Sequence, residues 1–267
     1  MIKKKIPSSS VQRKYSEEKA VDYYVELAKV GLYIWEEEMV GRYVKKGSLI
    51  LSVGCGAGRE PIALSTSGHE VIGLDIIHEM LHKGSLLAKE MNARHVHFTE
   101  MNAVSLGFHN DIFDAALLTN QLLTLIRKKV NRLLALREIF RVLKPGGVAI
   151  ITTHSIKSHL KYQIYFAFAN PLIRLASLLK ISSREPGDRY FRKHGRKVIT
   201  PTRAFVHMYT LNEGIADIKS AGFDLLNIRS RNEWLDSSNK KRIEKDYVIC
   251  FIAQKRKNEN IAESAKA

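Results

Sequence analysis

Cysteine and long apolar runs are scarce in this chain of 267 residues. The two cysteines, Cys55 and Cys250, have the spacing of neither a disulfide framework nor a zinc site. This small number of cysteines is typical of proteins in a reducing compartment, and we therefore expect a cytoplasmic protein. The basic start of the chain is not followed by the apolar stretch of a signal peptide, and no apolar run is long enough to span a bilayer. The composition excludes a disulfide-stapled secreted domain, and no pattern indicates a resident metal.

Acidic residues are also few, with 27 Asp and Glu against 43 Lys and Arg, for a formal net charge of +16. Residues 1–14 carry five basic residues and no acid, and residues 155–208 carry eleven against two acids. These segments contribute +5 and +9, so the rest of the chain is nearly neutral. Such a distribution implies an anionic partner for these two segments: RNA, DNA, membrane lipid or an acidic small molecule.

Residues 50–60, Ile-Leu-Ser-Val-Gly-Cys-Gly-Ala-Gly-Arg-Glu, are the most informative part of the chain. A short apolar strand runs into a glycine-rich turn and then a helix, whose free N–H groups can face a ligand. Asp75 ends the next apolar strand, 21 residues after Gly54. A carboxylate at that place can accept hydrogen bonds from ribose hydroxyls. The pattern predicts a nucleoside-binding strand–turn–helix–strand unit.

The spacing of the glycines indicates which nucleoside-containing ligand the turn binds. A dinucleotide fingerprint needs Gly-x-Gly-x-x-Gly, but here the third glycine, Gly58, comes one residue early. With Asp75 downstream, the turn resembles motif I of the class I S-adenosylmethionine-dependent methyltransferases. Residues 113–120 look like the fourth strand of that family, and residues 137–147, ending in Leu-Lys-Pro-Gly-Gly, look like the helix and turn before its fifth strand. The alternative is an unrelated doubly wound α/β protein with a coincidental glycine-rich turn.

The resemblance implies an α/β fold with a doubly wound, mostly parallel seven-stranded sheet, the Rossmann-like methyltransferase fold, and a lid inserted after strand five. Alternating helices and nearly all-apolar strands support a parallel sheet that is covered on both faces. The expected parts are a basic N-terminal arm with leading helices (1–46), a cofactor-binding core (47–154), a basic and partly apolar lid (155–208), the C-terminal part of the core sheet (209–255) and a polar tail (256–267).

The resemblance also implies S-adenosylmethionine as the cofactor and names the residues that would hold it. They are Gly54, Cys55, Gly56, Gly58 and Arg59 for its amino-acid part, Asp75 for the ribose, Ile76, Asn102 and Ala103 for the adenine, and Asn120 for the space between cofactor and acceptor. Ser52 stands where the family commonly has an acid near the methionine ammonium, which leaves a non-catalytic protein open. The catalytic residues are unknown; Asn120 and His154, at the end of strand five, are the candidates.

The methyl acceptor is unidentified, and the charge favours RNA. Residues 190–197 interleave aromatic and basic side chains, as for base stacking with phosphate contacts, and residues 205–223 faintly resemble the tRNA wobble-uridine methyltransferases. One alternative is a small-molecule or lipid-type acceptor under the apolar part of the lid, residues 165–175, with the basic residues on an anionic membrane. Another is a non-catalytic nucleic-acid-binding protein with the same fold. The run Glu36-Glu37-Glu38 is interpreted as a solvated face.

Overall fold

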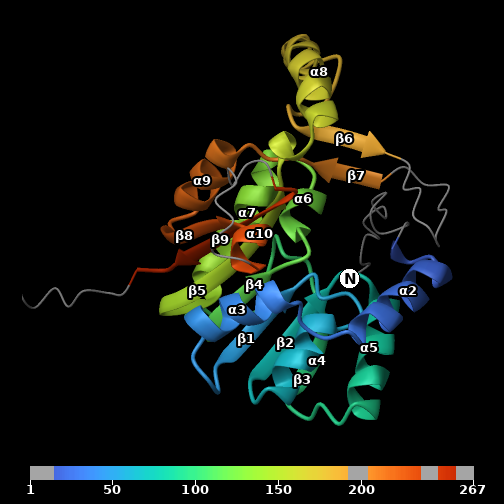
Figure 1. Cartoon of the computed structure of the whole chain (residues 1–267), viewed down its shortest axis with the longest axis vertical. Coiled ribbons are helices and arrows are strands. Elements are labelled where there is room, and N and C mark those ends of the chain that lie inside the picture. Colours follow the sequence, from blue (N-terminus) through green and yellow to red (C-terminus); the bar gives the residue numbers. More distant parts are fainter. Residues whose placement is uncertain (1–14, 192–203, 236–245, 257–267) are drawn as a thin grey trace, which may run out of the picture.

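A seven-stranded sheet with helices on both faces forms the body of the protein in a computed structural model, which describes residues 15–191, 204–235 and 246–256 (Figure 1). The sheet order is β3-β2-β1-β4-β5-β9-β8, and β9 runs antiparallel to both of its neighbours. The expected fold class is therefore confirmed. The strands of this sheet are β1 (Leu49–Val53), β2 (Glu70–Asp75), β3 (Val96–Glu100), β4 (Phe113–Leu118), β5 (Leu143–His154), β8 (Asp224–Ser230) and β9 (Val248–Gln254).

Helices pack on both faces of the sheet because the strands are apolar on both sides. Along β1, Leu51 and Val53 pack in one cluster with α7 and α9, whereas Ile50 packs in a second cluster with α3, α4 and α10. Helices α2 and α5 form a third cluster with α4. The helices are α2 (Glu18–Ala28), α3 (Ile34–Tyr43), α4 (Arg59–Thr66), α5 (His78–Glu90), α6 (Leu122–Leu125), α7 (Lys129–Val142), α8 (Leu160–Leu178), α9 (Leu211–Ser220) and α10 (Arg231–Leu235).

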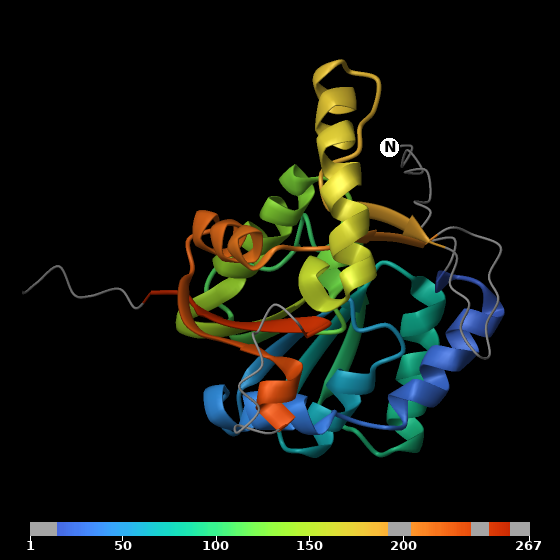
Figure 2. The same cartoon turned by 45° about the horizontal axis from the view of Figure 1, so that its top comes forward.

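The segment after β5 leaves the sheet and returns to it. A 3₁₀ turn (Ile156–Ser158) leads into α8, which projects from the body, and a hairpin of β6 (Asp188–Phe191) and β7 (Ala204–His207) follows (Figures 1 and 2). Phe166, Val206 and Met208 are buried together in a small cluster that joins the base of α8 to the hairpin. The inserted segment thus has an apolar core of its own. Within the described ranges, no helix is both long and apolar enough to cross a membrane.

A buried histidine ties the hairpin to α9. The ring of His207 lies between two carboxylates, with Nδ1 3.0 Å from Asp188 Oδ1 and Nε2 2.9 Å from Glu213 Oε1. Burial by itself lowers the pKa of His207, but the hydrogen bonds to Asp188 and Glu213 outweigh burial and raise it. Two carboxylate partners require both ring nitrogens to donate, which only the imidazolium can do. His207 is therefore a cationic clamp between β7, β6 and α9.

Candidate functional site

The glycine-rich turn follows β1 and has the left-handed backbone that its glycines allow. Gly54 and Gly58 have φ values of 68° and 92°, which side chains other than glycine rarely adopt. A Cβ at Gly54 would lie 2.5 Å from Leu122, and one at Gly58 would lie 2.7 Å from the ring of Phe98. The turn therefore needs glycine at both positions, for its conformation and for its close packing.

Asp75, at the carboxyl end of β2, braces this turn from the neighbouring strand. Its Oδ2 accepts a hydrogen bond from Gly56 N at 2.9 Å, and its Oδ1 accepts one from Ile77 N at 3.0 Å. Burial raises the pKa of Asp75, against the effect of these backbone hydrogen bonds. The two oxygens of a carboxylate can together accept about four hydrogen bonds, which suits a ligand with hydroxyl donors.

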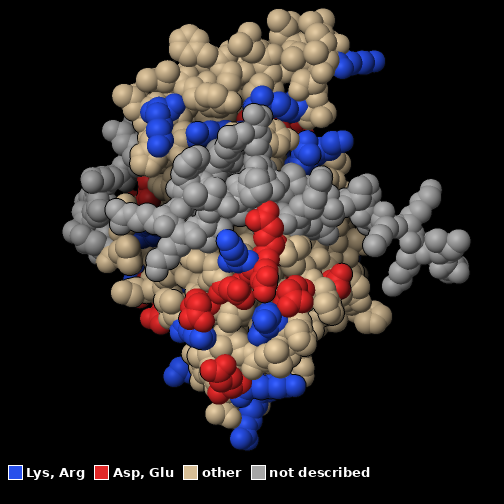
Figure 3. All heavy atoms as spheres, turned by 90° about the vertical axis from the view of Figure 1, so that its right-hand side faces the viewer, with Lys and Arg blue, Asp and Glu red and all other residues tan. Residues whose placement is uncertain are grey.

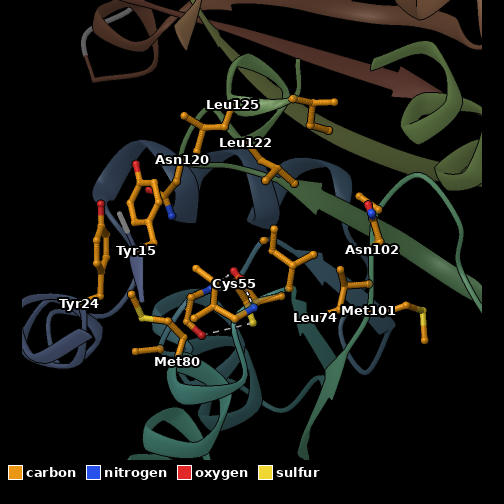
Figure 4. A pocket seen from close by; sticks show the side chains of 18 of the residues that line it. Tyr15, Tyr24, Cys55, Leu74, Met80, Met101, Asn102, Asn120, Leu122 and Leu125 are labelled. Atoms are coloured by element: carbon orange, nitrogen blue, oxygen red, sulfur yellow. Dashed lines mark hydrogen bonds between the residues drawn. The ribbon is translucent and has the colours of Figure 1, made fainter. Parts of the chain in front are cut away.

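A cavity of about 330 Å³ opens at the carboxyl ends of β1, β2 and β4. Figure 4 shows it as an elongated space: Tyr15 and Tyr24 lie at one end, Asn102 and Met101 at the other, and Leu122 lies across from the glycine turn. Ligands of open α/β sheets bind at this edge, so the cavity is the candidate site. The sequence-predicted residues that line it are Gly54, Cys55, Gly56, Arg59, Asp75, Ile76, Asn102, Ala103 and Asn120.

Asn120 is held at the cavity wall by a buried network of charged side chains. Its Oδ1 accepts from Arg59 Nη2 at 3.1 Å, and its Nδ2 donates to Glu60 Oε1. Arg59 also pairs with both oxygens of Glu36 from α3, at 2.6 and 2.7 Å, and with Glu60 at 2.8 Å. Burial opposes the charge on Arg59, but Glu60 and Glu36 outweigh burial and raise the pKa of its guanidinium. Asn120 therefore has a fixed orientation.

This network corrects the interpretation of Glu36-Glu37-Glu38 as a solvated face. Glu37 is exposed, but the side chain of Glu36 is only 1% exposed and lies against Arg59. Glu36 also accepts a hydrogen bond from Tyr33 N at 2.9 Å and so caps the start of α3. A run of three glutamates gives no local sign that one of them is buried, because its partner lies 23 residues further along the chain.

Two predicted site residues lie outside the lining of the cavity. Gly58 caps the start of α4 behind the turn, and His154 packs its ring against Tyr247, with ring centroids 4.3 Å apart. Burial lowers the pKa of His154 to about 4, so this histidine is neutral near physiological pH. Of the two catalytic candidates, the cavity is lined by Asn120 and not by His154.

Several lining residues were not anticipated from the sequence. The rings of Tyr15 and Tyr24 are tilted by 52° to each other, with their centroids 5.6 Å apart. Burial raises the pKa of both phenols, so they remain protonated. Leu122 and Leu125 come from the short helix α6. No spacing rule connects these residues, because their elements are brought together only by the packing around the turn. Burial likewise raises the pKa of Cys55 well above its usual range, so its thiol stays protonated.

The expected position of the apolar lid needs correction. Among the described residues, none between 155 and 208 lines the cavity. The segment 165–175 belongs to α8, which points away from the body instead of covering the cleft (Figures 1 and 2). The hairpin is nearer, since Arg127, a lining residue, lies 5.8 Å from the ring of Tyr190 and 5.6 Å from that of Phe205. Residues 192–197 of the basic, aromatic segment fall outside the described residues, as do residues 1–14.

The fold is that of a doubly wound α/β protein, with the cavity at the carboxyl edge of its sheet, where ligands of such proteins bind. Residues 50–147 match the family model of a methyltransferase domain. The demethylmenaquinone methyltransferases of Staphylococcus carnosus and Anoxybacillus flavithermus are 35% and 31% identical to this chain, over 52% and 57% of its length. The matches cover 58% and 66% of those proteins, less than two thirds of either.

Solved structures agree on the fold. A S-adenosylmethionine-dependent methyltransferase from Methanosarcina mazei superimposes with a TM-score of 0.65 at 24% identity, over 85% of this chain and all of the other. The cyclase SpnF superimposes with a TM-score of 0.64 at 18% identity, over 94% of this chain and 98% of its own. Residues 50–147 are thus similar to a methyltransferase domain, and the chain has the fold of the class I S-adenosylmethionine-dependent methyltransferases, whose cofactor is S-adenosylmethionine.

Proposed function

We propose that this protein transfers the methyl group of S-adenosylmethionine to a small molecule with an apolar body. The observation that carries the proposal is the meeting of the glycine turn, Asp75 and the pair Asn102 and Ala103 around one cavity. These are the positions that the family motif assigns to the amino-acid part, the ribose and the adenine of the cofactor. The curated relatives, named for a small-molecule acceptor, support the same class of reaction.

The residues that line the cavity fit the parts of S-adenosylmethionine. We assign the ribose hydroxyls to Asp75, which lines the cavity and whose carboxylate can accept hydrogen bonds from hydroxyl donors. The adenine would lie between Ile76 and Ala103, with Asn102 at its edge. Asn102 Oδ1 already accepts from Val104 N at 3.2 Å, so the side chain is oriented before the ligand arrives. The cofactor supplies a methyl group that its sulfonium charge has already activated.

The acid that the family commonly carries in strand one is replaced here by Ser52, which is buried and has no charge. We propose that Glu60 compensates for it. Glu36 and Glu60 both contact the single guanidinium of Arg59, and Glu60 Oε1 also accepts a hydrogen bond from Asn120 Nδ2. Burial raises the pKa of Glu36. Glu60 Oε2 is buried without a hydrogen-bond partner among the described residues. A negative charge on Glu60, next to the lining residue Asn120, would favour the ammonium group of the methionine part at that end of the cavity.

The rest of the lining favours an apolar acceptor over RNA. Beyond the cofactor residues, Leu27, Leu122 and Leu125 line the cavity, together with the aromatic side chains of Tyr15 and Tyr24. Among the described lining residues there is no histidine, and Asp75 is the one carboxylate, so no side chain is placed as a general base. The protein then acts by aligning the acceptor with the methyl group, and water takes up the acceptor proton once the methyl group has been transferred.

Calorimetry with S-adenosylmethionine tests the cofactor assignment. Asp75→Asn removes a charged acceptor, and we expect binding to weaken by about 1.5–3 kcal/mol, or roughly 10- to 150-fold. Glu100→Gln is the matched control, because Glu100 is the register partner of Asp75 on β3 but is exposed and outside the cavity. Equal affinity of the two variants, or tight binding of NAD in place of S-adenosylmethionine, would refute the assignment.

The acceptor class is tested by following S-adenosylhomocysteine release. The full chain is incubated with S-adenosylmethionine and either an organic-solvent extract or total RNA from the producing cells. We expect turnover with the extract and none with RNA, and mass spectrometry of the extract then identifies the methylated molecule. Turnover with RNA alone would overturn the small-molecule assignment, and the absence of turnover with either would favour a binding protein.

A further inference from the structure

Helix α8 exposes a continuous apolar stripe to solvent. The large side chains of the stripe are each more than half exposed, from 52% at Ile164 to 80% at Leu178. Over the 19 residues of α8, only Phe166 and Ile173 are buried. A helix on the surface of a globular protein normally turns its apolar face inward, so this one is inverted. The stripe consists of Leu160, Ile164, Phe168, Leu172, Leu175 and Leu178.

The stripe is one face and not a scatter of exposed residues. Its members are spaced by four, four, four, three and three positions. At 3.6 residues per turn they fall within a sector of about 120° along the whole helix. The two buried residues, Phe166 and Ile173, lie on the opposite side of the helix, and Phe166 packs there with Val206 of the hairpin. The helix is therefore fixed to the protein by one side and presents the other outward (Figure 2).

The charge around the stripe is of one sign. There is no Asp or Glu between residues 155 and 184, and Lys161, Arg174 and Lys180 are exposed on or beside α8. Leu179 and Ile181 flank Lys180 just beyond the helix and are 61% and 75% exposed. In Figure 3 the upper part of the molecule, where α8 lies, shows blue side chains around a largely uncharged projection, and most acidic side chains lie lower.

We propose that α8 is a membrane-surface element that inserts its apolar stripe into the headgroup region of an anionic bilayer. Interfacial helices combine an apolar face with flanking Lys and Arg, which interact with anionic lipid headgroups. Helix α8 projects from the body of the protein, so its exposed stripe is accessible to a partner outside the protein (Figures 1 and 2). The inference goes beyond methyl transfer and does not depend on it, because no residue of the stripe lines the cavity.

A lipid surface explains the composition better than the other possible occupants. Pairing with a second copy of α8 would bring Lys161, Arg174 and Lys180 against the same cations of the partner, with no acid in this segment to neutralise them. RNA would use the cations but would leave six large apolar side chains in water. An anionic bilayer can bury the apolar stripe and pair its headgroups with the three cations.

Vesicle sedimentation of the full chain tests the proposal, with phosphatidylcholine alone and with phosphatidylcholine mixed with phosphatidylglycerol. We expect the wild type to bind the mixed vesicles more tightly. The stripe variant Phe168→Ser, Leu172→Ser, Leu175→Ser should lower the partition constant by about tenfold or more. The control variant Leu86→Ser, Leu134→Ser, Leu226→Ser replaces three other exposed leucines, on α5, α7 and β8, and should bind as the wild type does.

A second variant separates the charges from the stripe. Replacing Lys161, Arg174 and Lys180 with Gln should reduce binding to the mixed vesicles by about fivefold for each residue, and leave binding to phosphatidylcholine unchanged. Unchanged calorimetric binding of S-adenosylmethionine shows that each variant is folded. The proposal is overturned if the stripe variant and the wild type bind vesicles equally, or if neither binds. It is also overturned if sedimentation velocity shows an oligomer that the stripe variant disrupts, or if that variant loses affinity only for RNA.

Discussion

Removal of Glu36 tests whether the buried network supports both the fold and the cavity. In Glu36→Ala, Arg59, whose side chain is only 4% exposed in the wild type, loses two charge-assisted hydrogen bonds, at 2.6 and 2.7 Å. Breaking a buried ion pair from one side costs about 3–5 kcal/mol. Arg59 keeps Glu60 at 2.8 Å and the carbonyl of Gly31 at 2.9 Å, so we expect the lower end, about 3 kcal/mol.

For a chain of this size, that loss lowers the melting temperature by about 6 °C. Thermal unfolding followed by circular dichroism measures it. Glu37→Ala is the matched control, since the neighbouring side chain is exposed, and its effect should stay within about 0.5 kcal/mol. Calorimetry should also show weaker binding of S-adenosylmethionine to Glu36→Ala, because Asn120 is oriented through Arg59. If Glu36→Ala and Glu37→Ala have the same melting temperature, Glu36 does not hold Arg59 and the reasoning fails.

Two further predictions concern packing and charge. A Cβ at Gly84 on α5 would lie 2.8 Å from the carbonyl oxygen of Ala57, so Gly84→Ala should displace the glycine turn. Calorimetry should then show weaker binding of S-adenosylmethionine. Gly41→Ala, on α3 where a Cβ would meet open space, should instead raise the free energy of unfolding by about 0.5–1 kcal/mol. The clamp at His207 has a raised pKa, so its contribution is complete below the ordinary value of 6.5 and is lost as pH rises through the raised pKa. Denaturant unfolding should show that His207→Gln is much less stable than the wild type in acidic buffer and only slightly less stable in alkaline buffer. The exposed control His97→Gln should match the wild type at both pH values. A loss of stability in His207→Gln that does not change with pH would contradict the cationic clamp.

Much of the fold and part of the site follow from local sequence patterns. The turn at Gly54 and Gly58 needs a backbone that only glycine adopts readily, and Asp75 follows it at the interval of one helix and one strand. Such features depend on neighbours in the sequence, so they can be inferred without a structure. The seven-stranded sheet was likewise inferred from the alternation of apolar strands with helices and from the resemblance.

The contacts between segments that are distant in the sequence could be learned only from the tertiary structure. Glu36 looks like one of three solvated glutamates until α3 packs beside α4 and brings it to Arg59. His154 was expected near the active-site edge, yet packing against Tyr247 keeps it out of the cavity lining. The apolar segment 165–175 was expected to cover the cleft, but Phe166 and Ile173 anchor α8 by its opposite side. Periodicity identifies the apolar face of a helix, whereas the direction of that face depends on which long-range contacts bury the other side.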